Sequence, residues 1–470
     1  MSTIKFILIS TFARIPSVLS STISGSTMHQ GTWEISLVVF FITGTIVGIG
    51  FQDRLVSFCR KHTKRSVDVT TDCECLDFVE ASHRHRVYPL MYCHMDILWH
   101  LDIDRMKQSV TLSGEVVPEI LYAYNFKKSR FVSLGYTADD VIKYNVEQPD
   151  HFLRLDLSSH PQLQIFITPK EDHDLVLIVM SHILSDGEGF LQYLYLLAAL
   201  YNGKNLDNNV QNLRDISLLL ENIHILAPTQ QTKYHRHISI PPLRSKENGS
   251  QIFCLTSQIP ASSMILIHQK AKKSEATLND VFMTAYARVI ARLKNINTVV
   301  LPCPANLRKF HPGLSDLTLA NMTGIYQKVV IEIPPGCSFT TTLQQVHLEM
   351  ELQKSQNRCF AGIKALNETF HKVPRPLLGQ VIKATYRLLP ISYSNLGIID
   401  HEKLHFKNCT IQSCFLTGTY RIPPDFQLTV STFKNICTLN CTLLGSADSE
   451  KGGQCLLELI KQEMLDWIIS

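Results

Sequence analysis

Two apolar segments in the first half of the chain enclose one short polar loop. Residues 175–180 are six apolar residues without alternation, rich in β-branched types, which predicts a strand buried on both faces. Residues 190–201 are long, apolar and rich in Leu and Ala, and Asn202 and Gly203 follow as a stop signal, so this segment predicts a buried helix. The loop between them, within SHILSDGEGF, therefore places His182 at the end of a central strand.

This loop has two interpretations. Histidine has an ordinary pKa near neutrality and a rigid strand end can fix its orientation, so His182 is a candidate general base. Asp186 would then be a carboxylate that ties the loop to a distant cation. Gly187 and Gly189 allow backbone angles and close approaches that a β-carbon forbids. In the alternative interpretation, His182 is an ordinary core histidine and the DGEG segment is a turn.

The second half of the chain shows alternating strand and helix signals. Residues 251–260, QIFCLTSQIP, predict a strand. Thr277 and Asp280 form a capping-box pattern, and the apolar run at 282–293 predicts the buried face of the helix that follows. The segment LPCPAN precedes Arg308, and its two prolines predict an edge strand or a strand end there.

The N-terminal region has a different character. Residues 35–51 form a 17-residue apolar run, which is the lower limit for a membrane-spanning helix. More basic residues follow the run than precede it, which predicts that the rest of the chain lies on the cytoplasmic side of a membrane. A buried hairpin and an artefactual leader remain as alternatives. The basic residues are Lys5 and Arg14 before the run, and Arg54, Arg60, Lys61, Lys64 and Arg65 after it.

Composition narrows the class of protein. With 470 residues, 45% of them hydrophobic and 18% charged, the chain can bury a large core and is expected to form two domains or subdomains. A net charge of +4 is small for this length, so no nucleic-acid partner is expected. Thirteen cysteines at irregular spacing indicate free thiols in a reducing, cytoplasmic compartment. Five glycosylation sequons keep a lumenal orientation open, at Asn248, Asn321, Asn367, Asn408 and Asn440.

A cluster of cysteines and histidines at residues 72–94 raises the question of a metal site. Structural zinc sites usually have two to four residues between paired ligands, whereas here one residue separates each pair. We therefore predict no metal. The residues of this cluster are Cys73, Cys75, His83, His85, Cys93 and His94.

Several motifs together resemble those of a known superfamily. HxxxDG, which begins at His182 and follows a buried strand, resembles the motif of the condensation-domain and alcohol acyltransferase superfamily, whose fold chloramphenicol acetyltransferase and the plant BAHD acyltransferases share. Further similar motifs follow in the family's order between Tyr88 and Leu459. They are the helix with T-x-N-D at 275–293, the strand end PANLRKF at 304–310, and the Asn-Gly loops NMTG at 321–324 and YSNLG at 393–397.

The resemblance implies an α/β fold of two chloramphenicol acetyltransferase-like sandwich subdomains with a tunnel between them. They would comprise residues 84–205 and 251–470, joined by a polar, Asn-rich linker at 206–250. An N-terminal segment, 1–65, with the possible membrane helix would precede them.

The resemblance also implies an enzyme that transfers an acyl group from an acyl thioester, acyl-CoA being the expected co-substrate, to a small alcohol. Such an enzyme is expected to need no metal or redox cofactor. His182 and Asp186 are the catalytic candidates, and Arg308 is the implied ion-pair partner of Asp186. The candidates for substrate binding and for stabilising the oxyanion are Gly187, Ser394 and Asn395.

Two features depart from the family pattern. Ser181 replaces the first of two adjacent histidines in the peptide-synthetase branch, which favours ester formation. The stretch between residues 112–124 and His182 is short, so the first subdomain is expected to be abbreviated. Two alternatives follow: a non-catalytic binding or scaffold protein that retains the fold, and a condensation enzyme that forms amides from carrier-bound acyl groups.

Overall fold

The chain's architecture comes from a computed structural model. The candidate membrane helix at 35–51 and much of the linker at 206–250 lie outside the described residues. Both therefore stay predictions from the sequence. The described residues are 69–146, 155–205, 210–221, 223–226, 242–246, 248–311, 317–385 and 388–470.

The first sheet is built around β8 (His173–Ser181), so the strand predicted from the apolar run at 175–180 is confirmed. β8 pairs antiparallel with one neighbour on each side, and its apolar residues from Val176 to Met180 are buried. The sheet has five strands, which lie in the order β13 (Thr410–Leu416), β3 (Leu90–Leu98), β8, β7 (Leu163–Pro169) and β6 (Ile142–Tyr144).

Helix α6 (Gly187–Tyr201) follows β8 and confirms the predicted buried helix. Its N-cap is Asp186, whose side chain accepts a hydrogen bond from the Gly189 N–H. α6 packs against α4 (Ile103–Val116) beside the sheet. The first half of the chain holds several further small elements, and the last two of them, together with β6 and β7, lie in the stretch before His182 that was expected to be short. They are β1 (Thr70–Asp72), α3 (Cys75–Ser82), η1 (Pro118–Leu121), β4 (Ala123–Asn125), β5 (Arg130–Val132) and α5 (Ala138–Val141).

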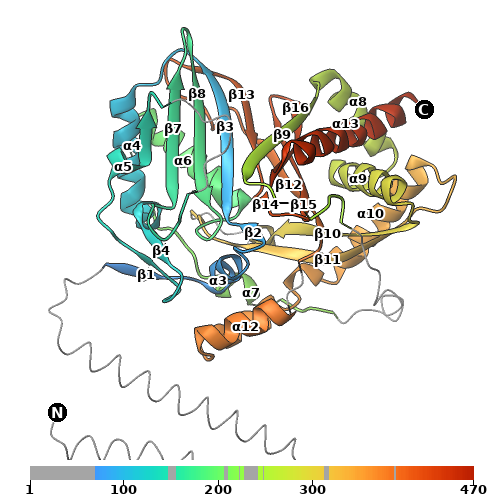
Figure 1. Ribbon diagram of the computed structural model, residues 1–470, viewed down its shortest axis with the longest axis horizontal. Helices are drawn as coiled ribbons and strands as arrows, with labels where there is room; N and C mark the ends of the chain where they lie inside the picture. The colour runs from blue at the N-terminus through green and yellow to red at the C-terminus, as the bar shows by residue number, and fades with distance from the viewer. Residues whose placement is uncertain are drawn as a thin grey trace, which may run out of the picture. The chain divides into compact units, whose positions relative to one another are not determined.

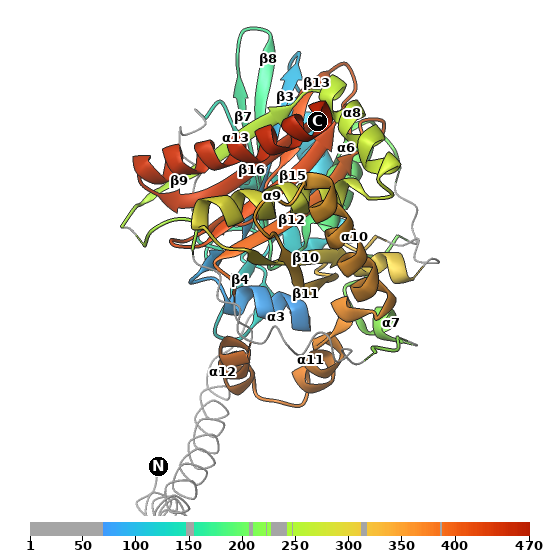
Figure 2. The same ribbon diagram turned by 90° about the vertical axis from the view of Figure 1, so that its right-hand side faces the viewer.

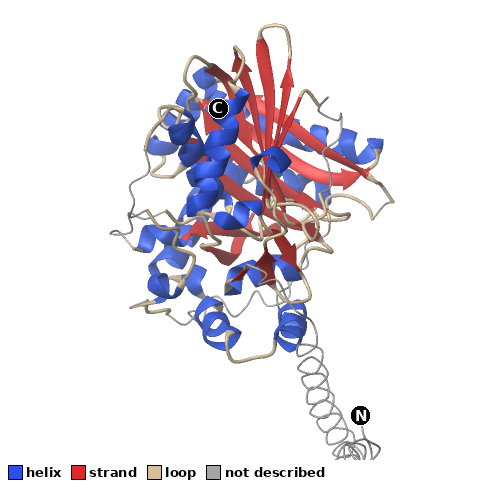
Figure 3. Ribbon diagram, turned by 90° about the vertical axis from the view of Figure 1, so that its left-hand side faces the viewer, coloured by secondary structure: helices blue, strands red, loops and turns tan. Residues whose placement is uncertain are grey.

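The second sheet has six strands. β16 (Ile436–Gly445) pairs antiparallel with β15 and with β9, and β9 confirms the strand predicted at 251–260. Three helices pack together and cover this sheet, and Figure 3 shows strands at the centre with helices outside them. The remaining strands are β12 (Ile391–Ile399), β15 (Phe426–Phe433), β14 (Tyr420–Arg421), β2 (Val87–Tyr88) and β9 (Gln251–Ile259), and the helices are α8 (Ala261–Lys273), α9 (Leu278–Lys294) and α13 (Ala447–Ile469).

A two-stranded antiparallel sheet lies next to β12. Its strands are β10 (Thr298–Asn306), as LPCPAN predicts, and β11 (Thr323–Glu332). Figure 2 shows α10, α11 and α12 on the side of these strands away from β16. The elements of this region are η3 (Leu307–Phe310), α10 (Phe339–Ser355), η4 (Arg358–Phe360), α11 (Ile363–Phe370) and α12 (Arg375–Thr385), with α7 (Ser217–Leu220) from the linker region.

The two sheets exchange strands. β13 comes from the second half of the chain but pairs with β3 of the first, and Figure 1 shows these strands side by side in red and blue. In return, β2 of the first half pairs with β14. Asn440 on β16 donates a hydrogen bond to the Leu416 carbonyl of β13 at 2.8 Å, so both sheets meet at this exchange. Residues 69–470 consequently form one compact unit.

The predicted cap of α9 is confirmed as well. The Thr277 side chain accepts from the Asp280 N–H, and the Asp280 carboxylate accepts from the Thr277 N–H at 2.9 Å. Among the described residues, no helix combines the length and the apolar character that a membrane crossing requires.

Candidate active site

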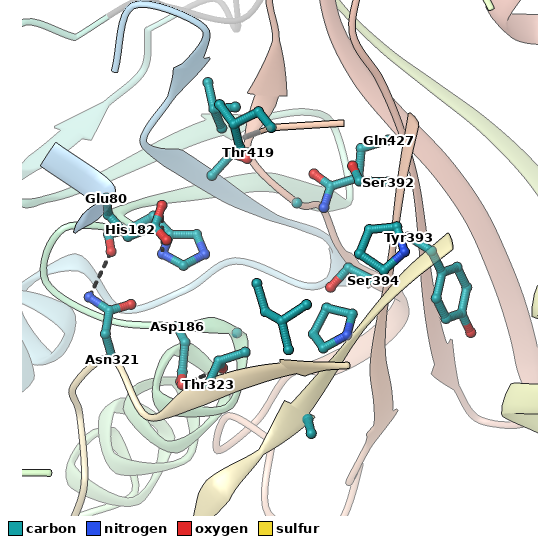
Figure 4. Close-up of a pocket in the computed structure, with 18 of the residues that line it drawn as sticks. Glu80, His182, Asp186, Asn321, Thr323, Ser392, Tyr393, Ser394, Thr419 and Gln427 are labelled. Carbon is teal, nitrogen blue, oxygen red and sulfur yellow. Dashed lines mark hydrogen bonds and ion pairs between the residues drawn. The ribbon is translucent and has the colours of Figure 1, made fainter. Parts of the chain in front are cut away.

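A cavity of about 620 Å³ opens beside the end of β8 and collects side chains from both halves of the chain. Its walls come from α3, the β8–α6 loop, β10, β11, β12 and β14, with an apolar surface on the β10 and β11 side. Figure 4 shows His182 on one side of it and Ser394 on the opposite side. Five residues proposed from the sequence line the cavity: His182, Asp186, Gly187, Ser394 and Asn395.

The His182 side chain is partly accessible, with 22% of its surface exposed. Its backbone N–H donates to the Pro89 carbonyl at 2.9 Å, which ties the residue to the start of β3. Its ring Nδ1 is buried and makes no hydrogen bond to another described residue. The nearest charged group to Nδ1 is the Glu80 carboxylate, with Oε2 at 3.9 Å. The ring is therefore held at a strand end with part of its surface open to the cavity.

Asp186 is almost fully buried, and both of its carboxylate oxygens are occupied. Oδ1 accepts from the Gly189 N–H at 2.9 Å. Oδ2 accepts from the Met322 N–H at 2.8 Å and from the Thr323 hydroxyl at 2.7 Å. Asp186 therefore joins the His182 loop to the start of β11 and has no oxygen left for a reactant.

Arg308, the implied partner, completes this arrangement. Its Nη1 donates to Asp186 Oδ2 at 3.0 Å, and the side chains of both residues are largely buried. The guanidinium also donates to the carbonyls of Thr318 and Ala320 at 2.7 and 2.9 Å. Burial alone would raise the pKa of Asp186, but Arg308 and the hydrogen bonds from Gly189 and Thr323 outweigh it and hold that pKa below its usual value. The pair is ionised and fixes the loop.

A second buried network holds the other side of the same loop, and the sequence analysis did not predict it. Asn321 donates from Nδ2 to the carbonyls of His182 and Ile183 at 2.9 and 3.0 Å and to Asp77 Oδ1 at 2.8 Å. Asp77 also pairs with Arg214 at 2.6 Å. NMTG had marked Asn321 as a loop residue and as a sequon, but its side chain is buried and its amide is a structural donor.

The YSNLG motif lies in strand β12, where a loop had been expected. The register with β15 shifts between Asn395 and Ile398, and Gly397 adopts a φ of 79°, so the strand is kinked at the motif. Asn395 uses its amide within the protein, since Nδ2 donates to Asn279 Oδ1 at 3.3 Å and Oδ1 accepts from the Gly397 N–H at 3.0 Å. The Ser394 hydroxyl makes no hydrogen bond to another described residue. Of the two, Ser394 is the more available donor.

Gly187 begins α6 at the edge of the cavity. A β-carbon at this position would lie 2.4 Å from Leu396 Cδ2 on β12, so the absence of a side chain lets the helix start approach β12. The first backbone N–H groups of a helix have no partner within the helix and favour negative charge. Gly187 therefore places such groups in the cavity wall, next to β12.

The cysteines and histidines at 72–94 do not form a metal site in this structure. Burial raises the pKa of Cys73 and of Cys75 to about 12, so both are neutral thiols. Burial also lowers the pKa of His94 to about 3, and its ring stacks on Phe415 with 4.6 Å between ring centroids. Within the described part of the chain, no group of three His, Cys, Asp or Glu side chains is placed to hold a metal ion.

No family model matches the chain, and no curated protein matches it by sequence. Solved structures match it by fold. The condensation domain of monacolin K polyketide synthase MokA has 12% sequence identity and a TM-score of 0.61 over 86% of this chain and 99% of that chain.

Two further solved structures match the chain by fold in the same way. The trichothecene 15-O-acetyltransferase TRI3 from Fusarium sporotrichioides has 11% identity and a TM-score of 0.59 over 85% of this chain and 95% of that chain. Polyketide synthase associated protein 5 from Mycobacterium tuberculosis has 12% identity and a TM-score of 0.58 over 82% of this chain and 95% of that chain. The described residues thus have the mixed α/β fold that condensation domains share with chloramphenicol acetyltransferase-like acyltransferases.

Proposed function

We propose that this protein is an acyltransferase that moves an acyl group from an acyl thioester, with acyl-CoA as the donor, to an alcohol. The observation that carries this proposal is the position of His182. Its imidazole opens into a cavity of about 620 Å³ while two buried networks fix its loop. The fold shared with a condensation domain and with an O-acetyltransferase supports the same class of chemistry.

The proposed reaction uses His182 first as a base and then as an acid. Its Nε2 takes the hydroxyl proton while the alcohol oxygen forms a bond to the thioester carbonyl carbon. The resulting tetrahedral intermediate collapses, the carbon–sulfur bond breaks, and the imidazolium returns the proton to the leaving thiolate. The products are an ester and a free thiol, and no covalent acyl-enzyme forms.

The negative charge on the intermediate needs hydrogen-bond donors that face the cavity. We assign this role to the Ser394 hydroxyl and to the backbone N–H groups at Gly187, and the assignment is supported by the position of both residues in the cavity wall. Asp186 and Arg308 act through the loop rather than on the reactant, since their polar atoms are committed to each other and to the backbone. The apolar residues of β10 and β11 offer a surface for the apolar part of a substrate.

The experiment is a thiol-release assay with purified protein, acetyl-CoA and longer acyl-CoA donors, and panels of alcohols and amines. The proposal predicts thiol release that depends on an alcohol, with a matching ester seen by mass spectrometry. Amide formed only from carrier-bound donors would support condensation chemistry instead. Absence of any acceptor-dependent thiol release, together with saturable binding of a thioester, would identify a binding protein that retains the fold.

A further inference from the structure

The further inference concerns Glu80 and rests on the proposed function, because it assigns a role beside the same base. Glu80 lies on α3, outside the HxxxDG loop, and lines the cavity together with His182. Its Oε2 is 3.9 Å from His182 Nδ1, and 31% of the Glu80 side chain is exposed. Figure 4 shows the two side chains next to each other on one side of the cavity.

The burial of His182 Nδ1 determines which ring nitrogen can react. Nδ1 has no solvent access and no hydrogen-bond partner among the described residues, yet the ring as a whole is 22% exposed. The accessible part of the ring is therefore on the side of Nε2. A buried polar atom without a partner is costly, and Glu80 is the acceptor within reach of a small side-chain rotation. Hydrogen bonds of this kind are often long in the free enzyme and shorten when substrate binds.

Helix α3 holds Glu80 in place through a residue one helical turn away. Asp77 is fully buried, pairs with Arg214 at 2.6 Å and accepts from Asn321 at 2.8 Å. Asn321 in turn donates to the His182 carbonyl. Because residues three apart share one face of a helix, the contact that fixes α3 against the His182 loop also directs Glu80 toward the imidazole.

Two other carboxylates near the His182 loop are each paired with an arginine. Asp186 is paired with Arg308, and Asp77 with Arg214. Among the described residues, the Glu80 carboxylate is the only acidic group within 4.0 Å of the His182 ring nitrogens. The remaining titratable or charged residues that line the cavity are His83 directly after α3, Glu188 on α6 and Arg421 on β14, with Tyr393 on β12.

We propose that Glu80 is a positioning residue for His182. Its carboxylate accepts the Nδ1–H hydrogen, which selects the tautomer with a free electron pair on Nε2 and stabilises the imidazolium that forms when the alcohol loses its proton. The only proton that moves travels from the alcohol to Nε2 and then to the thiolate.

The test compares Glu80→Gln with the unmodified full-length protein. We expect kcat to fall about tenfold or more, with KM for the thioester little changed, because the acceptor of the Nδ1 proton is weakened while the binding surface is kept. The acidic limb of the pH profile of kcat/KM should move to lower pH, since removing a nearby negative charge makes the imidazolium release its proton more easily. Glu80→Asp, which keeps the charge, should recover part of kcat.

A matched control is Glu115→Gln, which removes one carboxylate from an exposed position on α4 and should leave kcat and the pH profile unchanged. A readout independent of activity is ¹⁵N NMR of the histidine side chains, with the His182 signals assigned by their absence in His182→Ala. We expect an Nδ1–H tautomer in the unmodified protein and a lower titration midpoint in Glu80→Gln.

The outcomes separate the two proposals. If His182→Ala loses activity while Glu80→Gln keeps both its kcat and its pH profile, the role of Glu80 is wrong and the proposed function stands. If the unmodified protein has no transferase activity, the NMR titration still decides whether Glu80 controls the imidazole. An unchanged His182 titration in Glu80→Gln would overturn the inference.

Discussion

Asp186 is buried and ionised, and it takes no direct part in the proposed reaction. Burial disfavours its charge, but Arg308 and three hydrogen-bond donors more than compensate. A carboxyl group whose pKa is lower in the folded state contributes stability above its unfolded pKa, near 4, and loses that contribution as the pH falls through the folded value. Asp186 is therefore expected to stabilise the loop at neutral pH.

Asp186→Asn tests this electrostatic role. The substitution keeps the shape but leaves Arg308 buried without its counter-charge, so we expect a loss of about 3–5 kcal/mol in the free energy of unfolding at pH 7. Urea denaturation of both proteins at a series of pH values measures the difference. The difference in free energy of unfolding between the two proteins should stay constant from about pH 8 to pH 5 and become smaller below about pH 4. A stability difference that is absent at pH 7, or that increases in acid, would contradict the electrostatic role of Asp186.

The sequence indicated some of these residues and not others, for a physical reason. His182 and Asp186 could be predicted from a local pattern that consists of a buried strand, a polar loop and a buried helix. Arg308 came only from the resemblance to a family. Asn321 lies 139 residues along the chain from its partner His182. Arg214 lies 137 residues from its partner Asp77. No local pattern encodes such pairings, because they form only when the fold brings the segments together.

At the scale of elements, the confirmed predictions are those with strong local signals. β8 and α6 have long apolar runs, and α9 has a capping box. The sequence did not show that YSNLG lies within a strand, since Asn and Gly are both typical of turns. In the structure, pairing with β15 and a single residue of positive φ at Gly397 are enough to keep the motif in β12.

Gly324 in the NMTG motif illustrates a close approach between elements. A β-carbon there would lie 2.4 Å from the Cys359 carbonyl oxygen in η4, and 2.7 Å from Leu307 Cδ2. Because the backbone of η4 cannot move away as a flexible side chain can, Gly324→Ala should destabilise the protein by about 1–3 kcal/mol. The measurement is the free energy of unfolding in urea.

Gly452→Ala is the control for this substitution. Gly452 lies in the second turn of α13 with no heavy atom within 4 Å of a β-carbon, so alanine should leave stability unchanged or raise it by up to about 1 kcal/mol. Equal effects of the two substitutions would show that η4 can shift away from β11.

At the scale of the whole molecule, the exchange of strands joins the two halves. β13 completes the first sheet and β2 extends the second, so neither sheet is complete within one half of the chain. The resemblance predicted the two-part α/β architecture. The exchange depends on pairing over more than 300 residues, such as that of Phe415 with His94, which periodicity cannot reveal.

This exchange predicts that both sheets unfold together. Pulse-labelling hydrogen exchange in increasing urea, read by mass spectrometry, follows peptides from β8 and β16 in the unmodified protein. Both should lose protection at the same urea concentration, because opening either sheet breaks pairing that the other half supplies. Loss of protection in one sheet while the other remains protected would mean that the halves are independent domains.

If the His182 imidazole moves the proton in acyl transfer, the rate of thiol release by His182→Ala must fall. With the best donor and alcohol from the panel, turnover should fall by about a hundredfold or more while the thermal unfolding curve stays the same. Added imidazole should restore part of the rate in proportion to its concentration. A His182→Ala protein that turns over as fast as the unmodified one would contradict the account.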